Sequence, residues 1–260
     1  MSKYFIAFVV LFSLSPSLSA DEDAEQGLRI MTEVDLRDTG WVDYTVDLTM
    51  ILSNSRGETS ERQIRMKSKE TEGDGDRTLL VFDTPPDVRG TGLLTYTHFS
   101  GEDDQWLYLP ALKRIKRIAS KNKSGPFVGS EFAYEDLTSQ EVSKYSYKYL
   151  NDETIDGNEH FVVERYPLDK NSGYTRQIAW IDKEHYRFKK IEFFDRKNKH
   201  LKTLSFYGYG LYENRFWRAG SMIMENHVSK KSTQLSWNNF QFGLGVRDQD
   251  FNKNALKRVR

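Results

Sequence analysis

The stretch WVDYTVDLTMIL, residues 41–52, sets the fold class of this chain. Apolar or aromatic side chains occupy every even position from Val42 to Leu52, and Asp or Thr occupies the odd positions from Asp43 to Thr49. A period of two with one polar side is typical of a β-strand that buries one face and exposes the other to water. We therefore expect an antiparallel sheet to begin here.

Two further stretches of this kind follow directly. In residues 60–69, Ile64 and Met66 alternate with charged residues, and residues 77–83 read as a third strand. The turn signals of residues 54–57 and 71–76 separate these stretches from their neighbours. This spacing predicts an up-and-down meander of three strands. The prolines and glycines of residues 85–92 then interrupt the sheet, because proline removes a hydrogen-bond donor from the ladder.

The remaining chain predicts more strands and few helices. The N-terminal residues 21–38 have apolar side chains at spacings of three and four, which predicts a helix. Short helices are expected within residues 134–141 and 250–257. Residues 113–119 favour a strand, although Leu112, Ile115 and Ile118 also fit one helical turn. Further strands are expected at residues 93–98, 103–110, 143–150, 160–167, 174–182, 188–195, 200–207, 217–226 and 230–242.

These elements define one domain. About ten or eleven antiparallel strands and an N-terminal helix predict a mainly β fold, a curved sheet or open barrel. No change in composition marks a second domain. We therefore expect residues 21–260 to form a single domain.

The first twenty residues resemble a secretory signal peptide. Lys3 is followed by an apolar run from Tyr4 to Phe12 and then by small residues up to Ala20. The alternative, a membrane anchor, needs about 20 apolar residues, and this run is shorter. We expect cleavage near Ser19 or Ala20 and an exported, soluble protein. No cysteine follows the run, so the chain is not acylated there as a bacterial lipoprotein would be.

Charge and cysteine content exclude several classes of protein. The chain has 38 basic and 38 acidic residues, and loss of residues 1–20 removes only Lys3 among them, leaving 37 against 38. A nucleic-acid binder would be strongly basic. The absence of cysteine excludes disulfides and thiolate metal sites.

No catalytic motif stands out. The five histidines form no H-E-x-x-H pair, no G-x-S-x-G sequence is present, and Gly90-Thr91-Gly92 lacks the rest of a dinucleotide fingerprint. A Ser–His–Asp set assembled in space stays open at this stage. We predict no catalytic residue, no metal and no cofactor.

Two neighbouring stretches are candidates for binding. Residues 106–109, Trp106, Leu107, Tyr108 and Leu109, are apolar on both faces of a strand, which indicates either ordinary core or one wall of a cavity for an acyl chain. The densest basic stretch follows, with Lys113, Arg114, Lys116, Arg117, Lys121 and Lys123. It is either a solvated face or a contact for anionic lipid headgroups or an acidic partner. On a strand, Lys113 and Arg117 would share one face and Arg114 and Lys116 the other.

At these residues the chain resembles the LolA-like family of outer membrane lipoprotein-sorting proteins. The resemblance rests on PDVRGTGLL at residues 86–94, on DQWLYLPALKRIKRI at residues 104–118, and on GSEFAYEDL at residues 129–137. It covers roughly residues 25–255. It implies an incomplete antiparallel β-barrel whose concave side is closed by helices around an apolar cavity, to which we assign Phe132 and Tyr134 together with residues 106–109.

The resemblance also implies a role. Such a protein is a non-enzymatic carrier in the periplasm of a Gram-negative bacterium, binding lipoprotein acyl chains or other lipids and touching membrane surfaces transiently. Lys113, Arg114, Lys116 and Arg117 are then the predicted membrane or partner contact. Members of this type are associated with RND-family exporters, so the alternative is an accessory module that docks on such a transporter. A periplasmic hydrolase is a third hypothesis.

Overall fold

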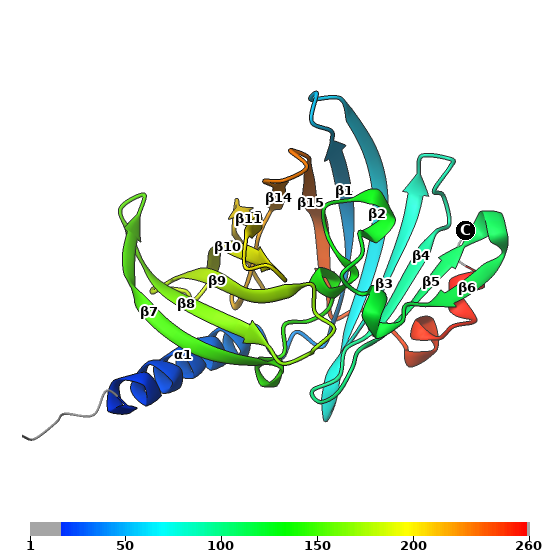
Figure 1. Cartoon of the computed structure of the whole chain (residues 1–260). Helices are drawn as coiled ribbons and strands as arrows, with labels where there is room; N and C mark the ends of the chain where they lie inside the picture. Colours follow the sequence, from blue (N-terminus) through cyan, green and yellow to red (C-terminus); the bar gives the residue numbers. More distant parts are fainter. Residues whose placement is uncertain (1–16, 259–260) are drawn as a thin grey trace, which may run out of the picture.

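A deeply curved antiparallel sheet dominates the computed structural model, which describes residues 17–258 (Figure 1). The predicted signal peptide lies outside the described residues except for its last four, which form the start of helix α1 (Ser17–Arg37). Within the described chain the sheet has thirteen strands in the order β6-β5-β4-β3-β2-β1-β15-β14-β11-β10-β9-β8-β7. Strands β6 and β7 are its two free edges, so the sheet is not closed into a barrel.

The strands follow the alternation of the sequence. Their bounds are β1 Asp43–Ser53, β2 Thr59–Thr71, β3 Asp74–Thr84, β4 Gly92–Tyr96, β5 Asp104–Leu109, β6 Arg114–Arg117, β7 Tyr145–Ile155, β8 Asn158–Pro167, β9 Tyr174–Asp182, β10 Phe188–Asp195, β11 His200–Tyr207, β12 Gly210–Tyr212, β13 Phe216–Arg218, β14 Ser221–Asn226 and β15 Ser232–Phe242. Strands β12 and β13 form a separate hairpin. The first and last strands pair in the middle of the sheet, where Leu48 lies opposite Trp237.

The prediction of a mainly β, open architecture is confirmed, and so is the N-terminal helix. The interruption at residues 85–92 is also confirmed, since β3 ends at Thr84 and β4 begins at Gly92. The expected ten or eleven strands are fewer than the fifteen of the described chain. Residues 217–226 form two short strands, and Gly210–Tyr212 forms one that was not expected. The predicted short helices are single 3-10 turns, η4 (Tyr134–Leu137), η6 (Asp248–Phe251) and η7 (Ala255–Lys257).

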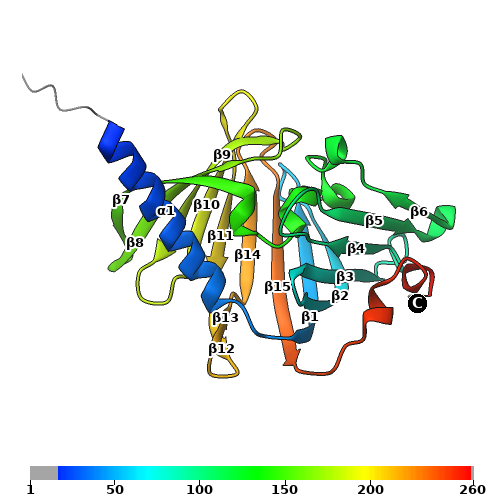
Figure 2. The same ribbon diagram turned by 90° about the horizontal axis from the view of Figure 1, so that it is seen from below.

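The two faces of the sheet are covered by different segments. The chain between β6 and β7 lies inside the curve, on the concave face, and α1 crosses the half of the sheet that ends at β7 (Figures 1 and 2). Ile30 and Met31 of α1 are buried in the same apolar cluster as Leu48, Leu80 and Val163 of the concave face. This placement follows from amphipathicity, because the helix buries its apolar side against the sheet.

The C-terminal segment covers the outer face of β3, β4 and β5 (Figure 2). Phe251 and Leu256 are fully buried there against Leu79, Leu94 and Trp106. A Cβ on Gly92 would lie 2.9 Å from the Leu256 side chain, so a larger residue there would force that side chain to shift. Strand β5 is therefore buried on both faces, as its sequence predicts.

Candidate functional site

The concave face is an apolar surface with one segment laid across it. We call residues 126–144 the strap; they include η3 (Phe127–Gly129), η4 and η5 (Val142–Lys144). Phe127 is fully buried, with its ring 5.6 Å from that of Phe82 and 5.7 Å from that of Tyr134. Phe132 is also buried in the concave cluster. The strap thus supplies apolar cover for the half of the sheet that ends at β6, which α1 does not cross.

Polar contacts hold the middle of the strap to strands β9, β11 and β15. Lys202 of β11 forms an ion pair of 2.6 Å with Asp136, and both side chains are about 5% exposed or less. The Tyr174 hydroxyl donates to the other oxygen of Asp136 at 2.9 Å, and the backbone amide of Glu131 donates to the Thr233 hydroxyl at 3.0 Å. A buried ion pair costs much to break, because one charge is left without a partner.

Glu135 adds a second contact at the same place. Its carboxylate accepts hydrogen bonds from the Ser172 hydroxyl at 2.7 Å and from the Gly173 amide at 2.9 Å. Burial raises the pKa of Glu135 above its ordinary value, although these two donors act in the opposite direction. A Cβ on Gly173 would lie 2.9 Å from the Glu135 carboxylate and 2.7 Å from Ser124, so only glycine fits between them.

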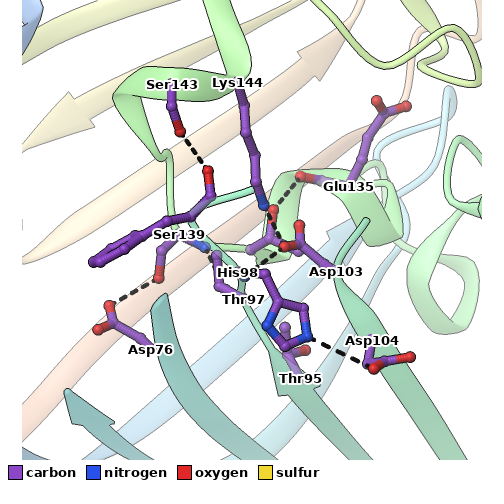
Figure 3. Close-up of polar contacts among 12 residues, drawn as sticks. Asp76, Thr95, Thr97, His98, Asp103, Asp104, Glu135, Ser139, Ser143 and Lys144 are labelled. Carbon is purple, nitrogen blue, oxygen red and sulfur yellow. Dashed lines mark hydrogen bonds and ion pairs between the residues drawn. The ribbon is translucent and has the colours of Figure 1, made fainter. Parts of the chain in front are cut away.

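The C-terminal end of the strap is held to β3 and to the loop between β4 and β5 (Figure 3). Ser139 donates to Asp76 of β3 at 2.9 Å, Ser143 donates to the carbonyl of Phe99, and Lys144 pairs with Asp103. Burial raises the pKa of Asp76 to about 6. Burial and the nearby Asp76 charge raise the pKa of Glu141 to about 7. The strap therefore spans the open barrel, held by polar groups at its middle and at its C-terminal end.

His98 is the histidine nearest to this fastening. Its Nδ1 lies 2.7 Å from Asp74. Its Nε2 lies 3.6 Å from Asp104 (Figure 3). In a Ser–His–Asp triad one ring nitrogen faces a carboxylate and the other faces the nucleophilic hydroxyl. Here both nitrogens face carboxylates, so His98 is placed to hold the chain after β4 rather than to activate a serine.

The structure divides the predicted cavity residues into two groups. Leu107 and Leu109 pack in the concave cluster, as do Phe132 and Tyr134 of the strap. Trp106 and Tyr108 lie on the outer face with the C-terminal segment. Alternation along a strand made this division inevitable, but the sequence did not show which segment would cover the outer face.

The predicted basic residues lie at the β6 edge. Lys113 lies in the turn before β6 with a φ of 48°, so it does not share a strand face with Arg117. Arg114 pairs across the strands with Leu109 and Lys116 with Leu107, which places both on the concave side of the edge. Arg117 forms an ion pair of 2.6 Å with Asp104. All four basic residues are exposed.

Two clefts of about 670 Å³ each indent the surface. One lies between the outer face of β1–β3 and the C-terminal segment, with Arg65, Lys67 and Arg247 in its walls. The other lies at the ends of β8–β11, beside His160 and Tyr209. None of the predicted cavity residues lines either cleft.

Sequence analysis missed the charged residues of the concave face. Lys202 shares a strand face with Leu204 and Phe206, and Arg165 of β8 shares one with Phe161 and Val163. A basic residue at the apolar positions of an alternating strand is the signal that would have identified both. In residues 17–258 no group of His, Asp and Glu forms a metal site, and no helix there is long and apolar enough to cross a membrane.

Comparisons with known proteins found one matching family model and several similar solved structures. A family model described as "Uncharacterized protein" matches residues 74–258. A crystal structure from Vibrio parahaemolyticus, named as an outer membrane lipoprotein-sorting protein domain, is 55% identical over 90% of this chain and 100% of its own, with a TM-score of 0.89. A DUF1329 family protein from Desulfovibrio piger is 28% identical over 90% and 99%, with a TM-score of 0.85.

A more distant relative shares the fold. A LolA superfamily protein from Nitrosomonas europaea is 19% identical over 90% of this chain and 99% of its own, with a TM-score of 0.72. Among curated proteins no sequence matches the chain. The open sheet with its N-terminal helix is thus the architecture of a LolA-like half-barrel.

Proposed function

The chain belongs to the family of outer membrane lipoprotein-sorting proteins, and from this premise we propose that it is a non-enzymatic periplasmic carrier of lipids. The cargo is an acyl chain, of a lipoprotein or of another lipid, held against the concave face of the sheet. The single observation that carries the proposal is the continuous apolar surface of that face under a strap fastened by polar contacts.

The physical basis is the burial of acyl methylenes. Each methylene removed from water contributes about 0.8 kcal/mol, so a surface of this kind supports binding of a long chain. The strap now provides that burial with Phe127 and Phe132. Because its fastenings include hydrogen bonds and ion pairs rather than covalent links, a lipid can replace it reversibly.

The basic edge of the sheet fits the same role. Lys113, Arg114 and Lys116 are exposed beside the concave face, and Leu112 at the same turn is 63% exposed. Basic residues near an anionic membrane contribute roughly 1 kcal/mol each. We place the transient contact with the donor or acceptor membrane here. Docking on an RND-type exporter stays a prediction from the family resemblance.

The test begins with protein recovered gently from the periplasm. Native mass spectrometry should show bound lipid, and the lipid-free protein should take up a fluorescent phospholipid from vesicles. Protein that carries no lipid and takes up none would refute the carrier function.

Strand β5 offers a matched pair of variants. Leu109 and Tyr108 are adjacent and both half-buried, but Leu109 belongs to the concave cluster and Tyr108 to the outer one. Leu109→Glu should reduce uptake, because an ionised carboxylate beside the acyl chain loses its hydration. Tyr108→Glu should leave uptake near that of the wild type. Equal effects of the two variants would place the cargo elsewhere.

A further inference from the structure

One cation on the strands of the concave face is buried without a counterion. Arg165 of β8 is 1% exposed and lies between the aromatic side chains of Tyr145 and Phe188, with its guanidinium carbon 4.9 Å and 5.8 Å from their ring centroids. Its Nε donates to the Gln177 side chain at 2.7 Å. Its Nη1 is buried and has no hydrogen-bond partner, and within residues 17–258 no carboxylate pairs with it.

The two adjacent carboxylates in the middle of the strap are engaged elsewhere. Asp136 is held by Lys202, the Tyr174 hydroxyl and the amide of Ala133. Glu135 accepts from Ser172 and Gly173. Within the described chain, the strands of the concave face therefore carry two buried cations, of which Lys202 has a carboxylate partner and Arg165 has none.

This contrast is informative because an unpaired buried charge is costly. Removing a charged group from water without a counterion costs several kcal/mol, and buried arginines are therefore found with partners. Two aromatic faces and one amide oxygen offset only part of this cost. A guanidinium with a free N–H is, in addition, the side chain best suited to bind a carboxylate or phosphate.

We propose that Arg165 binds the anionic headgroup of a lipid whose acyl chain lies on the concave face. The inference rests on the proposed carrier function and specifies its cargo as an acidic lipid, with a phosphate or carboxylate close to the chain. The unpaired Nη1 of Arg165 donates a hydrogen bond to an oxygen of that headgroup. Apolar residues around Arg165 bind the chain, and Arg165 selects the head.

The position of the strap explains how this site is reached. Tyr145, which packs on Arg165, donates its hydroxyl to Gln140 of the strap at 3.2 Å. Tyr147, opposite Arg165 on β7, donates to the carbonyl of Val142 at 2.9 Å. The C-terminal end of the strap therefore lies over the strand that borders Arg165, and its displacement uncovers the guanidinium together with the apolar surface.

The experiment compares two lipids that differ only in the acid group. Lipid-free protein is titrated calorimetrically with 1-oleoyl lysophosphatidic acid and with 1-monoolein, both below their micelle-forming concentrations. The wild type should bind the phosphate lipid about 10- to 100-fold more tightly, the ratio expected for hydrogen bonds to a charged group. Inorganic phosphate alone serves as the third probe.

The informative variant is Arg165→Met, which keeps much of the volume and removes the charge. It should bind both lipids with the affinity that the wild type shows for monoolein. Arg165→Gln, which retains a donor toward Gln177, replaces it if the Met variant does not fold. Arg176→Met is the matched control, because Arg176 lies on the neighbouring strand with its own partner, Glu164, at 2.8 Å. The control should keep the preference for the phosphate lipid.

The outcomes separate this inference from the function on which it rests. If both lipids bind equally to the wild type, or if Arg165→Met keeps the preference, the carrier function stands and the role of Arg165 is refuted. If neither lipid binds to the wild type, both the carrier function and the role of Arg165 are refuted. If inorganic phosphate binds as tightly as the lipid and depends on Arg165, the site serves a free anion and the lipid assignment is wrong.

Discussion

The buried pair of Lys202 and Asp136 allows the sharpest test of how the strap is held. Substitution Lys202→Met keeps an unbranched apolar side chain on β11 but leaves the Asp136 carboxylate with only the Tyr174 hydroxyl and the Ala133 amide as donors. Breaking a buried pair by removing one partner costs about 3–5 kcal/mol. For a domain of this size, each kcal/mol lowers the melting temperature by about 2–4 °C, so we expect a fall of roughly 6–20 °C.

The cause of this loss can be separated from a simple packing defect. In the double variant Lys202→Met/Asp136→Asn the neutral amide needs no counterion, so much of the lost stability should return. Lys183→Met is the control, because Lys183 pairs with Asp152 at 2.6 Å in an exposed position. Removal of such a surface pair should cost about 1 kcal/mol or less.

Thermal unfolding followed by circular dichroism measures the stability, and hydrogen exchange on residues 126–144 measures the opening of the strap. The strap should exchange faster in Lys202→Met than in the control, while β1 and β2 keep their protection until global unfolding. A melting temperature within 2 °C of the wild type, or a double variant no more stable than Lys202→Met, would refute the assignment of this pair as the fastening of the strap.

Three further predictions follow from other parts of the molecule. Trp106→Ala should destabilise the protein by about 3–5 kcal/mol in denaturant titrations while the remaining folded protein binds lipid normally, because the ring packs under the C-terminal segment; a selective loss of lipid binding would contradict this. The pKa of Glu141 is raised to about 7, so the folded state holds a proton that the unfolded state releases, and stability falls as pH rises from about 5 to 7.5. Glu141→Gln should flatten this fall in melting temperature with pH, and an unchanged slope would contradict the assignment to Glu141. Reversal of Lys113, Arg114 and Lys116 to Glu should leave the melting temperature intact and weaken binding to anionic vesicles, most strongly at low salt; unchanged binding at low salt would leave the stretch as a solvated surface.

The sequence by itself determined most of the long strands and the faces of those that alternate. Alternation is a local property, and the pattern of residues 43–53 is sufficient to place Val46, Leu48 and Met50 on one buried face. The double-sided apolar character of Trp106–Leu109 correctly indicated burial on both faces of β5. The family resemblance, which also rests on local motifs, correctly indicated the open half-barrel.

Only the tertiary structure decided what covers each face and which charges are buried. Trp106 is covered by Phe251 and Leu256, about 150 residues further along the chain, and no periodicity encodes so distant a contact. Lys202 and Asp136 are 66 residues apart, and although the position of Lys202 among apolar residues of an alternating strand marks it as unusual, nothing in the sequence pairs it with Asp136. Arg165 is defined as a candidate site by what it lacks, an acidic partner. That property exists only once the strands around it and the strap above it are packed, because burial is what makes an unpaired charge costly.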